Sequence, residues 1–447
     1  MMSRDFKLSR DVEVLPGNGF AQKKLQRVYQ EWKKQGSRLR NTLRAEEVDL
    51  SRALVPGEAG FDAETWADLT GNIRRASMLL ADSPHVNFLE QYREMGQFLF
   101  LQKHFVQTTY FKNAEDCVRI VGSYFSQKTI DGLLAQAKSF VTLYERIKKG
   151  DLLEVKYPSE EGHSERGSLP AVRKTWTTNT VQIDDGLHRL AVKWVLTQKT
   201  AKAIVLCPPM PTAVQSLVGK VSRSWGEREL FELHQPIGGV EFDDSWPIVR
   251  QCYDRLSMML TFLETYQQAS HEWSVLDLLC SYGWFVDQFA KIGCQAFGVD
   301  PNPAALKIGQ LAYGLQSEQL VKGDVQTFLN SCERTYDVVL LLSILQDFLP
   351  KSDFGSAIDI LKKVDRITEQ VLFFETGQAH ERWFRDSLRE WNNDFIVSFI
   401  KRHTSFTHVI PLGTDSDNVG GFSQNFGRTL FACVRSPGIW TSNLQDL

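Results

Sequence analysis

One stretch, residues 275–300, constrains the fold of this chain more than any other. Val275–Leu279 is a short apolar run with a single acid, Asp277, and the turn-tolerant sequence Cys-Ser-Tyr-Gly follows it. Apolar residues then recur at helical spacing up to Gly293, which can end a helix. A second apolar run, residues 294–299, ends in Asp300. The pattern predicts a strand, a tight turn, a helix and a second strand, which together form a βαβ unit.

The two acids of this unit predict where a ligand binds. In a parallel sheet, the loop after the first strand and the residue that ends the second strand face one crevice. A carboxylate at the end of the second strand accepts hydrogen bonds from two neighbouring hydroxyl groups, such as those of a ribose. We therefore expect Asp277 and Asp300 to border a site for a ligand that contains a nucleoside. The alternative is a doubly wound domain without a cofactor.

The same stretch resembles the nucleotide site of the class I methyltransferases that use S-adenosylmethionine (SAM). Their first motif is an acid followed by glycines two, four and six places later, and here these places hold Leu279, Ser281 and Gly283. Leu279 is the main departure, because a glycine there lets the backbone approach the cofactor and tolerates positive φ. A subset of the family reads Asp-Leu-Gly-Cys-Ser-x-Gly-x-Phe, which the chain matches at Asp277, Leu278, Cys280, Ser281, Gly283 and Phe285.

The resemblance implies a set of cofactor contacts along the crevice. Asp324 takes the place of the acid that accepts a hydrogen bond from the adenine amino group, with Val325 against the ring. Asp324 is also suited to a second role, as the N-cap of the helix that follows it. The full set of expected SAM contacts is Asp277, Leu279, Cys280, Ser281, Tyr282, Gly283, Asp300, Pro301, Asp324, Val325 and Ser343.

The strand and helix alternation continues beyond Asp300. Residues 336–343 form an apolar run, which is typical of a parallel strand covered on both faces. A long helix is predicted over residues 380–402, followed by strands at 408–412 and 429–434. The resemblance implies that this terminal hairpin completes a seven-stranded sheet with one antiparallel strand.

Three residues near the ends of strands are candidates for acid and base catalysis. Many members of the resembled family carry a His-His pair where this chain has Gln346 and Asp347. Because glutamine cannot take up a proton, the base is Asp347, comes from another strand, or is not needed. Glu375 and His380 follow the next strand and are the second candidates. The alternative for Glu375 is a charge at a helix N-terminus.

The first 150 residues are predicted to be mostly helical, with Asp62, Asn113 and Thr129 as N-caps. Residues 150–170 are rich in residues typical of loops, and a small α+β module is predicted over residues 151–215.

In this module, Asp185-Gly186-x-His188-Arg189 lies between a predicted strand and a predicted helix. Exposed amides at a helix start and a guanidinium group both favour a phosphate. The segment resembles the ParB/sulfiredoxin-like modules, whose Asp-Gly-x-His-Arg turn contacts nucleotide phosphates. The alternative is a structural ion pair between Asp185 and Arg189.

Residues 216–273 form a connector with a helix that is predicted to start near Pro247. On that helix Arg250 pairs with Asp254, and Arg255 points elsewhere. In bacterial methyltransferases that modify polysaccharides a similar segment lies over the cofactor, so Arg250 and Arg255 are candidates for contact with an anionic substrate. An ordinary surface ion pair is the alternative.

Composition excludes several classes of protein. The net charge of −3 gives no reason to expect nucleic acid as a partner. No apolar run approaches the ~20 residues of a membrane span, and the first residues lack the apolar core of a signal peptide. The seven cysteines are scattered singly, which favours reduced thiols in a cytoplasm and argues against a structural metal.

Together these features predict an α/β protein with a Rossmann-like methyltransferase domain at residues 274–447. We expect it to transfer the methyl group of SAM, its cofactor, to an oxygen of a small-molecule or saccharide acceptor that contains sugar or phosphate, with a nitrogen of such an acceptor as the alternative. A possible nucleotide at the middle module is the other expected ligand. The competing hypotheses are a non-catalytic scaffold that senses a nucleotide or SAM, and a dehydrogenase, although the glycine pattern of dehydrogenases is absent.

Overall fold

The computed structural model describes residues 45–58, 61–72, 78–95, 101, 104–150, 169–177, 179–206, 208–224, 232–243, 246–265, 273–349, 355–419, 423 and 427–435. The chain divides into two compact units, Met1–Met210 and Pro211–Leu447. No helix within the described residues is both long and apolar enough to cross a membrane.

The first unit contains a five-stranded mixed sheet in the order β1-β5-β3-β4-β2. The strands are β1 (Ala45–Asp49), β2 (Ala53–Leu54), β3 (Ala171–Lys174), β4 (Val181–Asp185) and β5 (Thr200–Leu206). The helices are α2 (Ala63–Thr70), α3 (Pro84–Met95), α5 (Thr109–Val121), α6 (Ile130–Lys148) and α7 (Leu187–Val195). Apolar residues of β1, α3, α5, α6, α7 and β5 belong to one core.

This arrangement corrects one expectation. The region before residue 150 was expected to be mostly helical and separate from the middle module, but its strands β1 and β2 join the sheet of that module. The two regions that the sequence suggested as separate therefore share a sheet and a core. Asp62 and Thr129 cap α2 and α6 as predicted, whereas Asn113 lies inside α5 and donates to Glu58.

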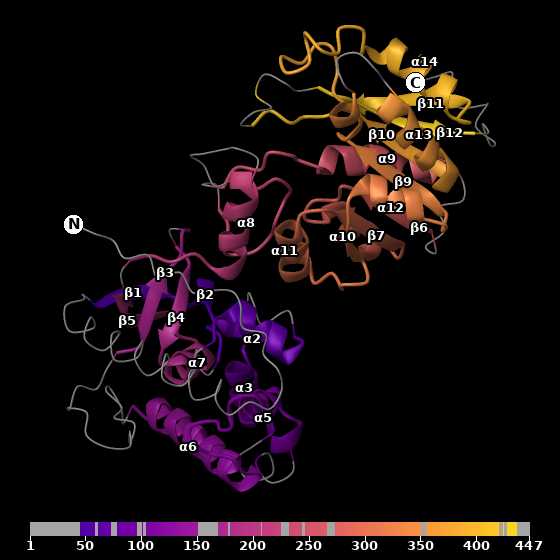
Figure 1. Ribbon diagram of the computed structural model, residues 1–447. Helices are drawn as coiled ribbons and strands as arrows, with labels where there is room; N and C mark the ends of the chain where they lie inside the picture. Colours follow the sequence, from indigo (N-terminus) through magenta and orange to yellow (C-terminus); the bar gives the residue numbers. More distant parts are fainter. Residues whose placement is uncertain are drawn as a thin grey trace, which may run out of the picture. The chain divides into compact units, whose positions relative to one another are not determined.

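The second unit contains a seven-stranded sheet in the order β11-β12-β10-β9-β6-β7-β8 (Figure 1). Its strands are β6 (Ser274–Leu278), β7 (Gln295–Asp300), β8 (Leu320–Lys322), β9 (Tyr336–Leu342), β10 (Thr368–Glu375), β11 (His408–Thr414) and β12 (Thr429–Val434). β12 is antiparallel to both of its neighbours, and the pairs from β10 to β8 are parallel. The predicted seven-stranded sheet with a terminal antiparallel hairpin is therefore confirmed.

Alternate residues of the central strands feed two different cores, which makes this unit a three-layer structure. Leu276, Val339 and Leu341 pack with α12 (Val325–Ser331), α13 (Gly355–Ile367) and α14 (Asn393–His403). Val338 and Leu340 pack on the other face with α9 (Tyr253–Thr265) and α10 (Trp284–Lys291). Two more helices, α8 (Ala213–Ser224) and α11 (Pro303–Tyr313), contact each other.

Two predicted helix starts are wrong. α9 begins at Tyr253, because the backbone of residues 247–250 hydrogen-bonds to Leu233 and His234, with a parallel bridge between Ile248 and Leu233. α14 begins at Asn393, because the segment before it is closed into turns by the hydrogen bond from Ala379 N to Trp391 O. Both segments reach the edge of the sheet where β6, β7 and β9 end, so these differences matter for the site.

Candidate functional site

A cavity of about 490 Å³ is lined by the carboxyl ends of β6, β7 and β9 and by the loops that follow them. This volume is in the range of small-molecule sites. The predicted cofactor residues that line it are Asp277, Leu279, Ser281, Asp300, Pro301 and Ser343. The βαβ unit thus brings its two acids to one cavity, as expected from parallel pairing of β6 with β7.

The loop after β6 has the backbone conformation that glycine favours. Leu279, Ser281 and Gly283 have φ of 54°, 53° and 79°, at the three places where the resembled family carries glycine. A left-handed conformation costs a residue with a side chain roughly 1–2 kcal/mol. Two hydrogen bonds brace the loop from outside: Gln235 Oε1 accepts from Tyr282 N at 3.1 Å and from Trp284 N at 3.3 Å.

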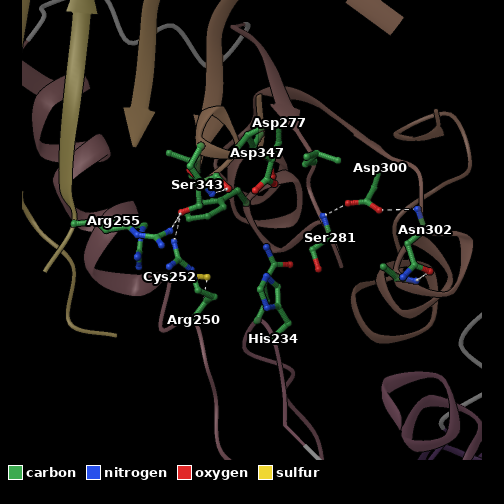
Figure 2. Close-up of a pocket in the computed structure, with 18 of the residues that line it drawn as sticks. His234, Arg250, Cys252, Arg255, Asp277, Ser281, Asp300, Asn302, Ser343 and Asp347 are labelled. Carbon is green, nitrogen blue, oxygen red and sulfur yellow. Dashed lines mark hydrogen bonds between the residues drawn. The ribbon is translucent and has the colours of Figure 1, made fainter. Parts of the chain in front are cut away.

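Asp300 fixes the other side of the cavity. Its Oδ2 accepts from Ser281 N at 2.9 Å and its Oδ1 accepts from Asn302 N at 2.8 Å, as Figure 2 shows. Burial raises the pKa of Asp300, and these two backbone donors act in the opposite direction. Each oxygen has a second lone pair, so the carboxylate can accept further hydrogen bonds.

Two buried oxygen atoms on the cavity wall receive no hydrogen bond from the residues that the structure describes. They are Oδ2 of Asp277, a residue that is 3% exposed, and Oγ of Ser281, a residue that is 6% exposed. Burial, and after it the charge of Asp300, raises the pKa of Asp277 well above its usual value. Buried polar atoms are normally hydrogen-bonded, so these two point to a polar ligand.

Five predicted cofactor residues do not line the cavity. Cys280 and Tyr282 are buried in the core, and Cys280 packs on Gly298, where an added Cβ would lie 2.6 Å from its Sγ. Gly283 lies against Leu315 and Leu320.

The other two residues of this group belong to α12. Asp324 is exposed and caps the helix, accepting from Thr327 N at 2.9 Å, and Val325 is buried beside it. The geometry of Asp324 is therefore that of its second predicted role, the N-cap.

A buried ion network borders the cavity on the side of β9 and β10. Arg255, 1% exposed, donates from Nε to Glu375 at 2.5 Å. Its two Nη atoms donate to Asp254, Asp415 and Asp417. Every nitrogen of this guanidinium group therefore has a carboxylate partner.

Two further arginines complete the network around Ser343. Arg250 donates from Nη2 to Glu375 at 2.6 Å and to Ser343 at 2.7 Å, and its Nη1 lies 2.9 Å from Asp417. Arg428 binds Glu381 through Nε and Nη2, at 2.9 and 2.7 Å, and reaches Ser343 Oγ at 2.9 Å. Figure 2 shows the guanidinium group of Arg250 pointing toward Ser343.

This network gives Arg250, Arg255 and Glu375 a common structural role beside the cavity. Arg250 and Arg255 both line the cavity, but they are buried and bound to carboxylates, which differs from the ordinary surface ion pair considered as the alternative. Glu375 is fully buried, and although burial opposes its ionisation, Arg255, Arg250 and Arg428 hold its pKa well below its usual value. A carboxylate held in this way is a structural anion and a poor proton acceptor.

The remaining catalytic candidates differ in position. Asp347 lines the cavity and its side chain is exposed there. Partial burial raises the pKa of Asp347, and the charge of Arg428 opposes this rise. His380 is also exposed but lies outside the cavity lining. Gln346 holds the loop, since its Oε1 accepts from Thr376 and from Gly377 N.

Sequence reasoning gave no role to several residues of the cavity. Two of them, His234 and Gln235, come from the segment between α8 and α9. Burial, followed by the charges of Arg250 and Arg255, lowers the pKa of His234 to about 3. Trp383, Phe384 and Arg428 come from the segments after β10 and before β12. These segments have no periodicity that would have revealed them.

Comparison with protein families adds one finding. Residues 276–368 match the family described as "Methyltransferase domain". The match begins within β6 and ends at the start of β10, so it includes both acids and Asp347. No curated protein matches the chain.

Solved structures with some similarity are distant. The bifunctional kinase-methyltransferase WbdD has 17% sequence identity over 50% of this chain and 46% of that chain, with a TM-score of 0.40. The chain therefore matches about half the length of WbdD. The N-methyltransferase NodS from Bradyrhizobium japonicum WM9 has 14% identity over 40% of this chain and 95% of that chain, with a TM-score of 0.30.

In the first unit, Asp185 and Gly186 lie between strand β4 and helix α7 as predicted, but the histidine of the predicted phosphate motif faces the core. His188 is 8% exposed and lies in an aromatic cluster, where its Nε2 is 2.9 Å from Tyr110 Oη. Asp185 and Arg189 lie 3.9 Å apart, and Arg189 packs over Gly186, whose φ is 87°. His188 is thus a core residue. The geometry favours a structural ion pair between Asp185 and Arg189 over a phosphate site.

Proposed function

We propose that this chain is a SAM-dependent methyltransferase whose cofactor lies between Asp277 and Asp300. The observation that carries the proposal is that these two acids end neighbouring parallel strands and line one cavity of about 490 Å³. The family match over residues 276–368 supports the same reading.

The residues of the cavity fit the chemistry of SAM. Asp300 has the remaining lone pairs to accept from two ribose hydroxyl groups. The unsatisfied Oδ2 of Asp277 suits a cationic amino group, which would also offset the cost of burying the carboxylate. When bound, SAM supplies a sulfonium methyl group that a nucleophile can accept.

The acceptor, on this proposal, is an oxygen of a sugar- or phosphate-containing molecule of polysaccharide or related metabolism in the cytoplasm. Asp347 is positioned to take the proton of the acceptor hydroxyl, because it is the catalytic candidate with an exposed carboxylate on the cavity wall. The acceptor oxygen gains a bond to the methyl carbon, the bond from that carbon to sulfur breaks, and the electron pair stays on sulfur. Alignment of these atoms supplies most of the catalysis.

A scaffold that binds SAM or a nucleotide without turnover is the second candidate, favoured by the side chain of Leu279 on the cavity wall. Calorimetry with SAM, followed by a turnover assay, separates the two. Binding with methyl transfer supports the enzyme, binding of SAM without transfer to any acceptor supports the scaffold, and absence of SAM binding contradicts the proposed site.

A further inference from the structure

The charges of the cavity select against an anionic acceptor. The three guanidinium groups on its wall are matched by four buried carboxylates, those of Glu375, Glu381, Asp415 and Asp417. A phosphate that approached these arginines would have to displace a buried carboxylate or lie beside it. Either arrangement leaves a buried negative charge without a partner, which is costly.

The segment after β10 adds an aromatic surface to the cavity. Trp383 lines it and is 50% exposed. Its neighbour Phe384 is fixed, because an added Cβ at Gly377 would lie 2.4 Å from the Phe384 ring and Arg428 lies over that ring at 5.7 Å. The two rings are nearly perpendicular, at 82°. Trp383 therefore offers an indole ring on a rigid support.

Asp347 adds a polar group to the same cavity. Its backbone N–H donates to Ile344 O, which holds the turn, and its carboxylate accepts no hydrogen bond from the described residues. A carboxylate accepts hydrogen bonds from two hydroxyl groups, whereas an aromatic ring packs on the C–H face of a sugar.

We propose that Trp383 and Asp347 form the acceptor site, and that the acceptor is an uncharged sugar whose C–H face packs on Trp383 while its hydroxyl groups donate to Asp347. This inference rests on the proposed function and narrows it from sugar- or phosphate-containing acceptors to neutral sugars. Trp383 is then a specificity-determining residue, and Asp347 binds and deprotonates the hydroxyl that is methylated.

The test compares variants and acceptors in the full chain. The variants are Trp383→Ala, Trp383→Phe and Asp347→Asn. The controls are Tyr253→Ala, which removes an aromatic ring that is 58% exposed and outside the cavity lining, and Asp386→Asn, which removes a surface carboxylate. Calorimetry measures SAM affinity. Transfer of radioactive methyl from SAM is measured with the methyl glycosides of glucose, galactose, mannose and N-acetylglucosamine, with their 6-phosphates, and with glucosamine.

We expect at least one neutral glycoside to be methylated, with kcat/KM at least about tenfold above that of its 6-phosphate. Trp383→Ala should raise KM for the glycoside about tenfold while SAM affinity stays within about twofold, and Trp383→Phe should retain most of the affinity. Asp347→Asn should lower kcat by about 100-fold or more. Both controls should behave as the wild-type chain.

The results that would overturn the neutral-sugar acceptor differ from those that would overturn the proposed methyltransferase function. Binding of SAM combined with methylation of only phosphorylated or amino acceptors overturns the inference and leaves the proposed function standing. The same holds if SAM binds and no neutral glycoside is methylated, or if Trp383→Ala leaves KM unchanged. If SAM does not bind, the proposed function fails and the inference fails with it.

Discussion

Nε of Arg255 lies 2.5 Å from Oε2 of Glu375 in an ion pair whose two side chains are 1% and 0% exposed. Through Asp415 and Asp417 the same guanidinium group also holds the segment that follows β11. Arg255→Met would leave the buried Asp415 without its guanidinium partner, and among the described residues it would leave Glu375 and Asp417 paired with Arg250 alone. We expect the free energy of unfolding of the second unit to fall by about 3–5 kcal/mol, measured by urea denaturation.

The control for this variant is Arg389→Met, which breaks an ion pair with Asp386 whose side chains are 76% and 94% exposed. Exposed pairs contribute little, so we expect a change below about 0.5 kcal/mol. Equal, small effects in the two variants would contradict the role given to the buried network.

Asp277→Asn should stabilise the ligand-free chain and weaken SAM binding. Because the pKa of Asp277 is raised in the folded state, its contribution to stability is fully present below the unfolded pKa of 3.8 and is lost as pH rises through the folded pKa. Asparagine carries no charge at any pH. The variant should match the wild-type chain near pH 4 and exceed it by roughly 1–2 kcal/mol at pH 8 in thermal unfolding. A wild-type advantage at pH 8 would be incompatible with this account.

Leu279→Gly tests the conformation of the loop after β6. The φ of Leu279 is 54°, which glycine adopts without the cost that a side chain imposes. We expect the variant to bind SAM at least as tightly, measured by calorimetry. Its stability in thermal unfolding should stay within about 1 kcal/mol of wild type, because relief of the positive φ is offset by the lost apolar contacts of the leucine side chain. Weaker binding would indicate that the leucine side chain itself contacts the cofactor.

His188→Gln tests the core of the first unit. Burial, followed by the charge of Arg189, lowers the pKa of His188 to about 3. The contribution of His188 to the free energy of unfolding is therefore fully present above its usual pKa of 6.5. This contribution is lost as pH falls toward the pKa of the folded state, and the loss is about 2 kcal/mol at pH 5. Hydrogen exchange of α7, corrected for the intrinsic rate, should show a weaker pH dependence in the variant. His104→Gln, a half-exposed histidine of the same unit, should retain the wild-type dependence, and an unchanged dependence in the His188 variant would refute this burial effect.

The strands of the second unit, and the placement of Asp277 and Asp300 at one cavity, could be predicted from the sequence. Apolar runs predicted β6, β7 and β9 because strands covered on both faces require them. The place of the terminal hairpin came from the resemblance, since strand order depends on contacts that no local pattern encodes.

The sequence failed where long-range contacts decide the structure. Arg255 meets Asp415 across 160 positions of the chain, so local helical spacing suggested the wrong partner for Arg250 and no partner for Arg255. For His188 a local signal was available and was missed. Ala191, Val192 and Val195 follow it at helical spacing and are buried with it, which marks an apolar helix face.

The most direct test of the central claim is a calorimetric titration of SAM into the wild-type chain and two matched variants, Asp300→Asn and Asp324→Asn. Asp300 lines the cavity, whereas Asp324 caps α12 and lies outside the lining, where asparagine can still act as a cap. We predict one SAM per wild-type chain, an affinity at least about tenfold lower for Asp300→Asn, and an affinity within about threefold of wild type for Asp324→Asn. Absence of SAM binding to the wild-type chain, or undiminished affinity in Asp300→Asn, would contradict the account.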